Sequence, residues 1–349
     1  MNIGILTFHE ADSYGAVLQA YALQHTLSKM GADSEFVQIN SRKAPEQQPA
    51  LTGAAAIFAR KLQEEGKKRE ALFAQFRSQH LKISELYEPG AAIDDRYDSF
   101  VAGSDQIWNF RIPGADARYF LPFASPKKRY SYAASFGAEE LPEQAKSWVA
   151  DQLAQFREIS VREESGCRIV KELTGREAAL CLDPTLLVER EDWELLCEKK
   201  ETEPYVLLFL LKYDEALVSK AKAEAEKRGT AFRVITAAFM PQIGMAAWNG
   251  TGVTEWLSAI RNAQCVFTNS FHGIVFSILF GREFHVERLG GELSSRNGRI
   301  DELLAFLQFT DAFDGVAKSD YDRVWELLEE RRTASLAYLR KVMDHDAAI

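Results

Sequence analysis

The sequence NSFHG, residues 269–273, carries the residue types best suited to chemistry. It joins an apolar run typical of a buried strand to an apolar run long enough for a helix. Asn269 and Ser270 are good helix caps, and the start of a helix attracts anions. His272 would fall in the first turn, so its imidazole would lie beside a bound anion, an arrangement that suits chemistry on a phosphorylated substrate. The alternative is that these residues serve only as caps and hydrogen-bonding groups.

Other polar residues follow predicted strands elsewhere in the chain. Ser104 and Asp105 follow the apolar run 99–103, and Arg162 follows the short apolar run 159–161. In doubly wound sheets, ligands lie beyond the carboxyl ends of the strands, so these positions suit substrate binding. Alternatively, Ser104 and Asp105 only cap the next turn, and Arg162 forms a surface ion pair with a neighbouring glutamate.

The elements that would position these residues follow a repeated pattern. Residues 2–8 read as a buried strand, 16–30 as an amphipathic helix and 34–39 as a second strand. This β-loop-α-β order indicates a parallel, doubly wound sheet. The loop before the helix contains Ser13 and a single glycine, Gly15, and therefore lacks a dinucleotide-binding fingerprint.

A charged stretch near residues 189–204 separates two such patterns. We therefore predict an α/β fold of two doubly wound, Rossmann-like domains that face a cleft, an architecture shared by many transferases acting on sugars. The first domain is expected at 1–190, with a helical surface excursion at 41–84. The second is expected at 204–318 and carries the NSFHG sequence. An exposed, charged C-terminal helix is expected at 319–349, and its apolar residues, such as Trp325 and Leu328, are candidates to pack on the first domain or on a partner.

Composition excludes several functional classes. The 349 residues contain 42 Lys and Arg against 51 Asp and Glu, a net charge of −9 that argues against nucleic-acid binding and a polybasic membrane anchor. The four cysteines lack metal-ligand spacing, so we expect no zinc site and no disulfides, as in the cytoplasm. The chain starts directly with a predicted strand, without a signal-peptide pattern, and no apolar run approaches the length of a membrane span.

Six sequence blocks are more informative together than any one alone. They are SYGAVLQAYAL (13–23), VAGSDQIWN (101–109), SYAASFG (131–137), SVREESG (160–166), LDPTLL (182–187) and TNSFHGIVFSILFGREF (268–284). In this order they resemble the polysaccharide pyruvyl transferase family, over nearly the whole chain from about Gly4 to Leu304. The resemblance implies a fold similar to that of two-domain, GT-B-like glycosyltransferases.

The resemblance also implies a reaction. Members of the family move the pyruvyl group of phosphoenolpyruvate onto two hydroxyls of a sugar, which makes a cyclic ketal and releases phosphate. The His of the SFHG block falls on His272 and the Arg of the VRE block on Arg162, which implies catalytic roles for both. Ser13 stands where the family often has Asn, a difference that bears on acceptor contacts. If the acceptor is lipid-linked, the protein would contact a membrane surface without an anchor.

Ketal formation needs a group that gives and takes protons near neutral pH, which suits His272. Arginine suits the carboxylate and phosphate of the donor, because its planar fork binds oxyanions with two parallel hydrogen bonds. The candidate cations are Arg162, Arg288, Arg296, Arg299 and Lys212, three of them in the segment 287–300, which we expect to be a loop. Asn269 and Ser270 would donate to phosphate, whereas Asp105 would bind acceptor hydroxyls. No metal or cofactor is required, because arginine and the helix dipole can stabilise the charge.

Two other functions stay open at the level of sequence. One is a glycosyltransferase that uses a nucleotide-activated sugar, although the chain has no clear nucleotide-reading signature. The other is a non-catalytic carbohydrate-binding or assembly protein, which would tolerate loss of His272. Each basic residue named above also has a simpler interpretation as a solvated surface charge.

Overall fold

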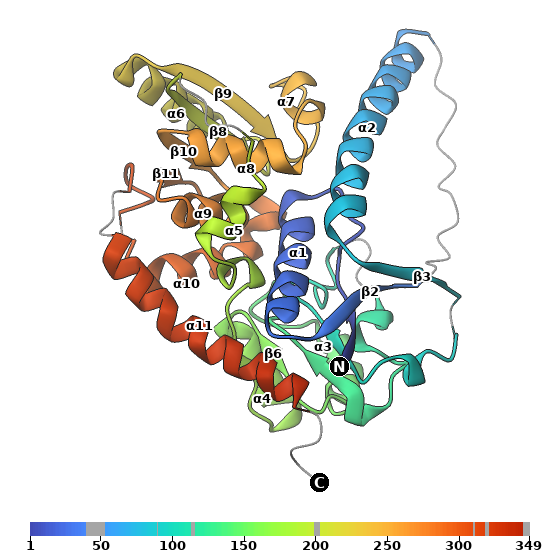
Figure 1. The fold of residues 1–349 in the computed structure, drawn as a ribbon. Coiled ribbons are helices and arrows are strands. Elements are labelled where there is room, and N and C mark those ends of the chain that lie inside the picture. Colours follow the sequence, from blue (N-terminus) through green and yellow to red (C-terminus); the bar gives the residue numbers. More distant parts are fainter. Residues whose placement is uncertain are drawn as a thin grey trace.

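The computed structural model describes residues 1–39, 53–88, 90–112, 116–198, 203–309, 311–317 and 321–344. Its strands lie in three sheets, and all neighbouring strands within each sheet are parallel. The predicted α/β class with parallel sheets is therefore confirmed. The two larger sheets come from different halves of the chain, before and after the charged stretch 189–204 (Figure 1).

The first sheet has the strand order β3-β2-β1-β4-β5. Its strands are β1 (Asn2–Leu6), β2 (Asp33–Ile39), β3 (Ile83–Tyr87), β4 (Ser99–Ala102) and β5 (Arg129–Ser131). Helix α1 (Tyr14–Lys29) connects β1 to β2. Leu6 pairs with Ala102, so the carboxyl ends of β1 and β4 are neighbours. The loop before α1 and the polar residues after β4 therefore lie at the same edge.

A short two-stranded sheet lies beside β5, because Tyr130 of β5 forms a parallel bridge to Glu158. It consists of β6 (Ser160–Val161) and β7 (Ala179–Leu180), with α3 (Glu143–Leu153) and α4 (Glu164–Thr174) in the same region. Ala134 forms isolated parallel bridges both to Asp105 and to Val161. The residues that follow β4 and β6 are therefore held close together, which brings Asp105 near Arg162.

The second sheet has the order β11-β10-β8-β9. Its strands are β8 (Tyr205–Leu210), β9 (Ala231–Thr236), β10 (Cys265–Thr268) and β11 (Glu283–Val286). Every residue of β8 is buried, as expected for a continuous apolar run in a central parallel strand. The helices of this half are α6 (Glu215–Arg228), α7 (Ala246–Asn249), α8 (Val253–Asn262), α9 (Phe271–Leu279) and α10 (Gly298–Phe306).

Helix α2 (Gly53–His80) follows β2 in the chain and packs against the second half. The prediction of a surface excursion at 41–84 did not include this contact. The first part of that excursion, residues 41–52, lies outside the described residues. Figure 1 shows α2 beside α7 and α8. Arg69 of α2 is 3% exposed and donates to the carbonyl oxygens of Trp248 (3.0 Å) and Ala237 (3.4 Å). The helix is thus bound to the second half by a buried cation.

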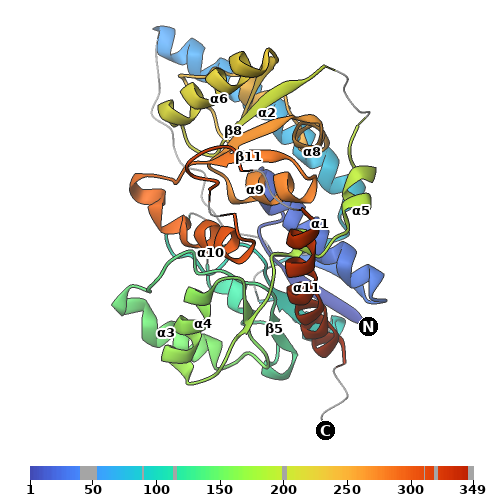
Figure 2. The same ribbon diagram turned by 90° about the vertical axis from the view of Figure 1, so that its left-hand side faces the viewer.

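The C-terminal helix α11 (Tyr321–Met343) is packed, not exposed as the sequence analysis predicted. It runs from the second half of the chain back to the region of β6 and α4 (Figures 1 and 2). Tyr338 donates to the carbonyl oxygen of Ser131 (2.8 Å), and Ser335 accepts from the backbone N–H of Leu182 (3.0 Å). The many charged residues of α11 suggested exposure, whereas Leu328 and Leu339 belong to a buried stripe; the alternative that Leu328 packs within the protein is the correct one.

One further expectation needs correction. The segment 287–300 is not simply a loop, because it contains the 3₁₀ turn Gly291–Arg296 and the start of α10 at Gly298. The charged stretch 189–204 contains α5 (Arg190–Leu195), whose Trp193 is fully buried. The ring centroid of Trp193 lies 4.9 Å from that of Phe276 in α9. One apolar core therefore continues from the first half of the chain into the second.

Candidate active site

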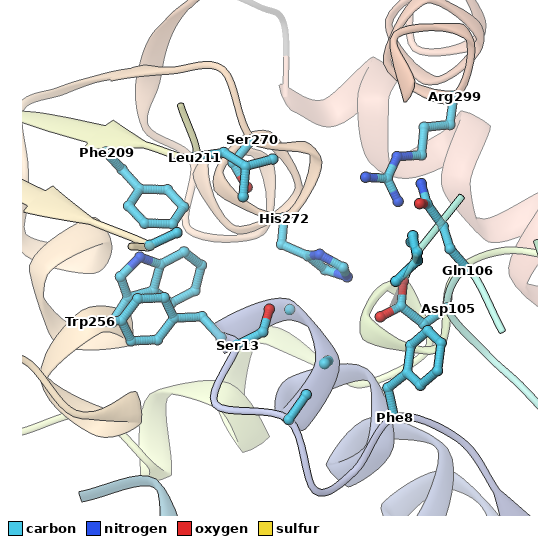
Figure 3. Close-up of a pocket in the computed structure, with 16 residues that line it drawn as sticks. Phe8, Ser13, Asp105, Gln106, Phe209, Leu211, Trp256, Ser270, His272 and Arg299 are labelled. Carbon is cyan, nitrogen blue, oxygen red and sulfur yellow. The ribbon is translucent and has the colours of Figure 1, made fainter. Parts of the chain in front are cut away.

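A cavity of about 210 Å³ lies where both halves of the chain contribute strand ends and helix starts. Its walls come from the loop before α1, the residues after β4, the ends of β8 and β9, the side of α8 and the starts of α9 and α10. The lining residues include Ser13, Gly15, Asp105, Ser270, His272 and Arg299. Figure 3 shows the imidazole of His272 in the middle, between Ser270 on one side and Asp105 on the other.

The NSFHG sequence folds as predicted, from strand β10 directly into helix α9. The hydroxyl of Ser270 accepts from the backbone N–H of Gly273 (3.4 Å) and lines the cavity. Asn269 does not line the cavity, and its side chain instead binds the backbone after β8. Its amide oxygen accepts from the N–H of Leu211 (2.8 Å), and its amide nitrogen donates to the carbonyl of Lys212 (2.7 Å). Asn269 therefore fixes the end of β8, while Ser270 caps the start of α9, where the helix dipole favours a negative charge.

His272 is 7% exposed and is held between the two halves of the chain. Its Nδ1 side packs against Gly15, where an added Cβ would lie 2.0 Å from Nδ1. Its Nε2 atom lies 3.6 Å from Oδ2 of Asp183. Glycine at position 15 is therefore required for the ring to occupy this place.

Asp183 joins His272 to Arg162 in a buried network. Its Oδ2 accepts from Nη1 of Arg162 (2.6 Å), and its Oδ1 accepts from the hydroxyl of Thr185 (2.7 Å). The side chains of Asp183 and Arg162 are each 1% exposed. Burial alone would raise the pKa of Asp183, but His272 and Arg162 outweigh it and hold that pKa well below its ordinary range. Asp183 is therefore a buried carboxylate that lies between His272 and Arg162.

Arg162 is occupied by carboxylates and does not line the cavity. Besides Asp183, its guanidinium contacts Oδ1 of Asp105 (3.1 Å) and Oε2 of Glu163 (3.6 Å). The alternative of a surface ion pair is excluded, because the pairs are buried. Arg162 thus lies behind the cavity wall, where it holds Asp105 and Asp183.

Asp105 lines the cavity from the end of β4. Its backbone has φ of 71°, in the left-handed region that non-glycine residues rarely adopt. Burial would raise its pKa, but Arg162, His272 and Arg299 outweigh this effect and lower it. The cavity therefore contains a carboxylate that stays ionised at neutral pH.

Of the basic residues predicted to bind the donor, Arg299 lines the cavity, whereas Arg288 and Lys212 do not. Arg299 lines the cavity, and its guanidinium lies 5.0 Å from the ring centroid of Phe271. Arg288 pairs with Asp301 (2.8 Å), and Lys212 donates to the carbonyl of Gly290 (3.1 Å); neither lines the cavity. The side chain of Arg296 lies outside the described part of the structure.

Two predicted residues from the first half also differ in their placement. Ser104 is fully buried and donates to the carbonyl of Ala133 (2.7 Å), so it supports the turn and does not line the cavity. Ser13 lines the cavity at the N-cap position of α1. Its side chain makes no cap hydrogen bond to the start of α1.

Sequence reasoning missed several residues of the site. Tyr14, Phe209 and Trp256 form an aromatic wall, in which the rings of Tyr14 and Trp256 stack with centroids 5.0 Å apart. Tyr14, Gln106 and Asp183 lie inside the SYGAV, SDQIW and LDPTLL blocks, so the blocks could have indicated them. No sequence signal marks Phe209 and Trp256, because buried aromatic residues of this kind are usual in any core.

Within the described ranges, no group of three His, Cys, Asp or Glu side chains is arranged to hold a metal ion. Across the same ranges, no helix combines the length and the apolar character that crossing a membrane requires.

Comparisons with solved structures identify the fold. UDP-GlcNAc 2-epimerase from Methanocaldococcus jannaschii, in complex with UDP-GlcNAc and UDP, has a TM-score of 0.50 at 11% identity, over 98% of this chain and 99% of that chain. UDP-GlcNAc 2-epimerase from Neisseria meningitidis has a TM-score of 0.47 at 8% identity, over 98% of both chains. UGT89C1 from Arabidopsis thaliana, complexed with UDP-L-rhamnose, has a TM-score of 0.41 at 11% identity, over 98% and 94%. Among these three structures, only the Methanocaldococcus jannaschii enzyme reaches a TM-score of 0.50, and at 11% identity its likeness concerns the fold alone; the predicted GT-B-like fold class is confirmed.

Comparison with protein families is more specific. No curated protein sequence matches the chain. The family described as polysaccharide pyruvyl transferase matches residues 14–286, a range that includes Gly15, Asp105, Arg162, Asp183 and His272. The match supports a pyruvyl transferase role in polysaccharide biosynthesis, with a sugar acceptor. The chain belongs to the polysaccharide pyruvyl transferase family.

Proposed function

We propose that the protein transfers the pyruvyl group of phosphoenolpyruvate onto two hydroxyls of a sugar, forms a cyclic ketal and releases phosphate. One observation carries the proposal. The imidazole of His272, at the start of α9, faces the same cavity as Arg299 and Asp105. The cavity therefore combines a proton carrier, an anion-binding helix start, a cation and a carboxylate.

His272 is the proton carrier in this proposal. It protonates the methylene carbon of the donor, which makes the neighbouring carbon electrophilic, and the first sugar hydroxyl adds there. Phosphate then leaves, and the second hydroxyl closes the ketal. The methylene carbon takes up one proton and the two hydroxyls release two, so one returns to the imidazole and the other leaves with phosphate. A positioned group of this kind contributes about 10²–10⁴-fold to the rate.

The phosphate of the donor would bind at the start of α9. Ser270 lines the cavity at the N-cap of α9, and the helix dipole favours a negative charge there. Arg299 supplies the full positive charge at the cavity. No metal ion is needed in this scheme, because the helix start stabilises the charge that develops on the leaving phosphate and Arg299 offsets the negative charge of the donor as a whole.

The acceptor would bind on the Asp105 side. An ionised carboxylate accepts hydrogen bonds from sugar hydroxyls, and it repels phosphate, which keeps the phosphate of the donor at the start of α9. The aromatic wall formed by Tyr14, Phe209 and Trp256 offers an apolar face to a sugar ring. We expect the acceptor to be a precursor of an exopolysaccharide or cell-wall polymer, free or lipid-linked.

Arg162 and Asp183 act as positioning residues in this scheme. Asp183 lies 3.6 Å from Nε2 of His272 and sets the orientation of the imidazole. Arg162 holds Asp183 and Asp105 at once, with distances of 2.6 Å and 3.1 Å. The carboxylates of Asp105 and Asp183 are thus both anchored to the guanidinium of Arg162. This explains why a buried arginine is present behind the cavity.

Thermal melting in the presence of ligands tests the donor. Phosphoenolpyruvate at 100 times its dissociation constant should stabilise the protein by about 2.7 kcal/mol. Arg299→Ala should remove most of this shift, because it removes the cation of the cavity. Arg288→Ala is the matched control from the same segment, since Arg288 does not line the cavity and pairs with Asp301. The shift should survive in this variant.

A panel of nucleotide sugars provides the opposing outcome. Stabilisation by a nucleotide sugar, without stabilisation by phosphoenolpyruvate, would overturn the proposal in favour of glycosyl transfer. A third outcome would favour a non-catalytic binding protein. In that case only sugars stabilise the protein, His272→Ala does not change this stabilisation, and no phosphate is released from phosphoenolpyruvate.

A further inference from the structure

Gln106 is a buried donor in the cavity wall that the scheme above does not use. It is 2% exposed and follows Asp105 at the end of β4. Its Nε2 atom is buried and makes no hydrogen bond with any described residue. An amide N–H left without an acceptor costs about 1–3 kcal/mol, so a buried one in a cavity wall needs an explanation.

The neighbouring hydrogen bonds fix which way the amide of Gln106 points. The oxygen Oδ1 of Asn109 accepts from the backbone N–H of Arg111 (3.0 Å), so Nδ2 of Asn109 must be its donor end. This Nδ2 donates to Oε1 of Gln106 (3.0 Å). The oxygen of the Gln106 amide is therefore used inside the protein, and the N–H₂ end is left over.

The amide is also held in place from behind. A Cβ added at Gly137 would lie 2.4 Å from Nδ2 of Asn109 and 2.9 Å from Cδ of Gln106. Glycine at position 137 therefore lets the backbone close directly onto both amides. This close packing makes Gln106 a preorganised donor instead of a mobile side chain.

Arg299 lies at the same end of the cavity. Figure 3 shows its guanidinium and the amide of Gln106 pointing toward one another, on the side of His272 away from Ser270. An amide N–H₂ and a guanidinium are both donors, so together they suit two oxygen atoms of an anion. The start of α9, near Ser270, provides a second and separate place for an anion.

We propose that Gln106 and Arg299 bind the carboxylate of the donor, while the start of α9 binds its phosphate. The inference rests on the proposed function and adds a determinant of substrate class. Phosphoenolpyruvate carries these two anionic groups on one carbon atom, and the cavity offers two donor sites on opposite sides of His272. The pair would make the protein select enol phosphates that carry a carboxylate over those that do not.

The test compares two ligands that differ only in the carboxylate. Phosphoenolpyruvate and vinyl phosphate are titrated calorimetrically into wild type, Gln106→Met and Gln106→Glu. Loss of a hydrogen bond to a charged group should weaken phosphoenolpyruvate binding by about 10–100-fold in Gln106→Met. Gln106→Glu keeps the acceptor for Asn109 but turns a carboxylate toward the ligand, so it should weaken binding at least as much. The affinity for vinyl phosphate should stay within about twofold in Gln106→Met. Gln155→Glu, at an exposed glutamine of the first half, is the control.

Three outcomes would overturn the inference. Equal weakening of both ligands in Gln106→Met would assign Gln106 to the phosphate, and unchanged affinities would remove it from donor binding. If wild type binds no phosphoenolpyruvate, the proposed function itself fails and the inference falls with it. If Gln106→Glu does not fold, the Gln106→Met result decides alone.

Discussion

The imidazole of His272 lies directly against the backbone of Gly15, so closely that a Cβ at position 15 would be 2.0 Å from Nδ1. Gly15 belongs to the first turn of α1 in the first half of the chain, whereas His272 belongs to the first turn of α9 in the second half. Two helix starts from different halves therefore meet at the candidate catalytic group. The contact ties the position of the imidazole to the packing of the two halves.

Gly15→Ala should inactivate the protein without unfolding it. The methyl group and the ring cannot both keep their places, so the imidazole must move away from Asp183 or the helix starts must separate. We expect a loss of turnover of about 10²–10⁴-fold, the contribution of a positioned proton carrier, and a lower melting temperature. Phosphate release from phosphoenolpyruvate in the presence of an accepting glycan measures this effect.

Gly315→Ala is the matched control for this substitution. A Cβ at Gly315 would meet no atom within 4 Å, and the backbone there does not need glycine. Turnover and melting temperature should therefore match those of the wild type. Full activity in Gly15→Ala would contradict the assignment of His272 in its present orientation.

Asp183→Asn should destabilise the protein in a pH-dependent manner. It removes one partner of a buried ion pair with Arg162, which costs about 3–5 kcal/mol near pH 7. The pKa of Asp183 is lower in the folded state than in the unfolded chain. The contribution of ionised Asp183 to the free energy of unfolding is therefore complete above the pKa of the unfolded chain, about 3.9. As the pH falls below that pKa, the contribution decreases by about 1.4 kcal/mol per pH unit.

Urea unfolding of the wild type and Asp183→Asn between pH 7 and pH 3 measures this difference. The gap in the free energy of unfolding should be constant down to about pH 4 and then narrow. Asp151→Asn, at an exposed position of α3, should change the free energy of unfolding by less than about 0.5 kcal/mol. A gap that widens toward low pH would refute the assigned role of Asp183.

The local strands, helices and turns of the site were easier to predict from the sequence than the contacts between its residues. The strand-to-helix turn at 269–273 is predictable because caps, an apolar strand and an apolar helix all act locally. Ser270 and His272 were therefore assigned to the right place, and so were Asp105, Ser13 and Gly15 at strand and helix ends.

The partners of Arg162 and Arg299 depend on contacts between distant segments. Arg162 and Asp183 are separated by a helix and a strand, and nothing local tells an arginine bound to substrate from one held by buried carboxylates. Arg299 and Arg288 stand in one segment with similar neighbours, yet only Arg299 lines the cavity. The C-terminal helix was misjudged for a related reason, since its buried stripe is hidden among many charged residues.

Arg69→Met should weaken the attachment of α2 to the second half of the chain. The guanidinium of Arg69 donates to the hydroxyl of Tyr14 (2.9 Å) and to the carbonyls of Trp248 (3.0 Å) and Ala237 (3.4 Å). Methionine fills much of the volume but leaves these buried oxygen atoms without a donor. We expect a loss of about 2–4 kcal/mol in the free energy of unfolding.

Arg60→Met is the control for this change, because Arg60 is exposed on the same helix. Its free energy of unfolding should stay within about 0.5 kcal/mol of the wild type in urea titrations. A similar loss in both variants would show that the helix responds to any loss of charge, and the buried contacts of Arg69 would then not explain the effect.

His272→Gln should abolish chemistry while it preserves the fold and donor binding. Glutamine retains hydrogen-bonding groups of similar reach but cannot carry a proton near neutral pH, so turnover should fall by about 10²–10⁴-fold. The affinity for phosphoenolpyruvate, measured by calorimetry, should change far less, because the start of α9 and Arg299 are untouched. His80→Gln, at a partly buried histidine of α2 outside the cavity, should leave both quantities unchanged. A His272→Gln variant with normal turnover would mean that another group moves the proton, and Asp105, the remaining titratable carboxylate of the cavity, would then be the residue to replace.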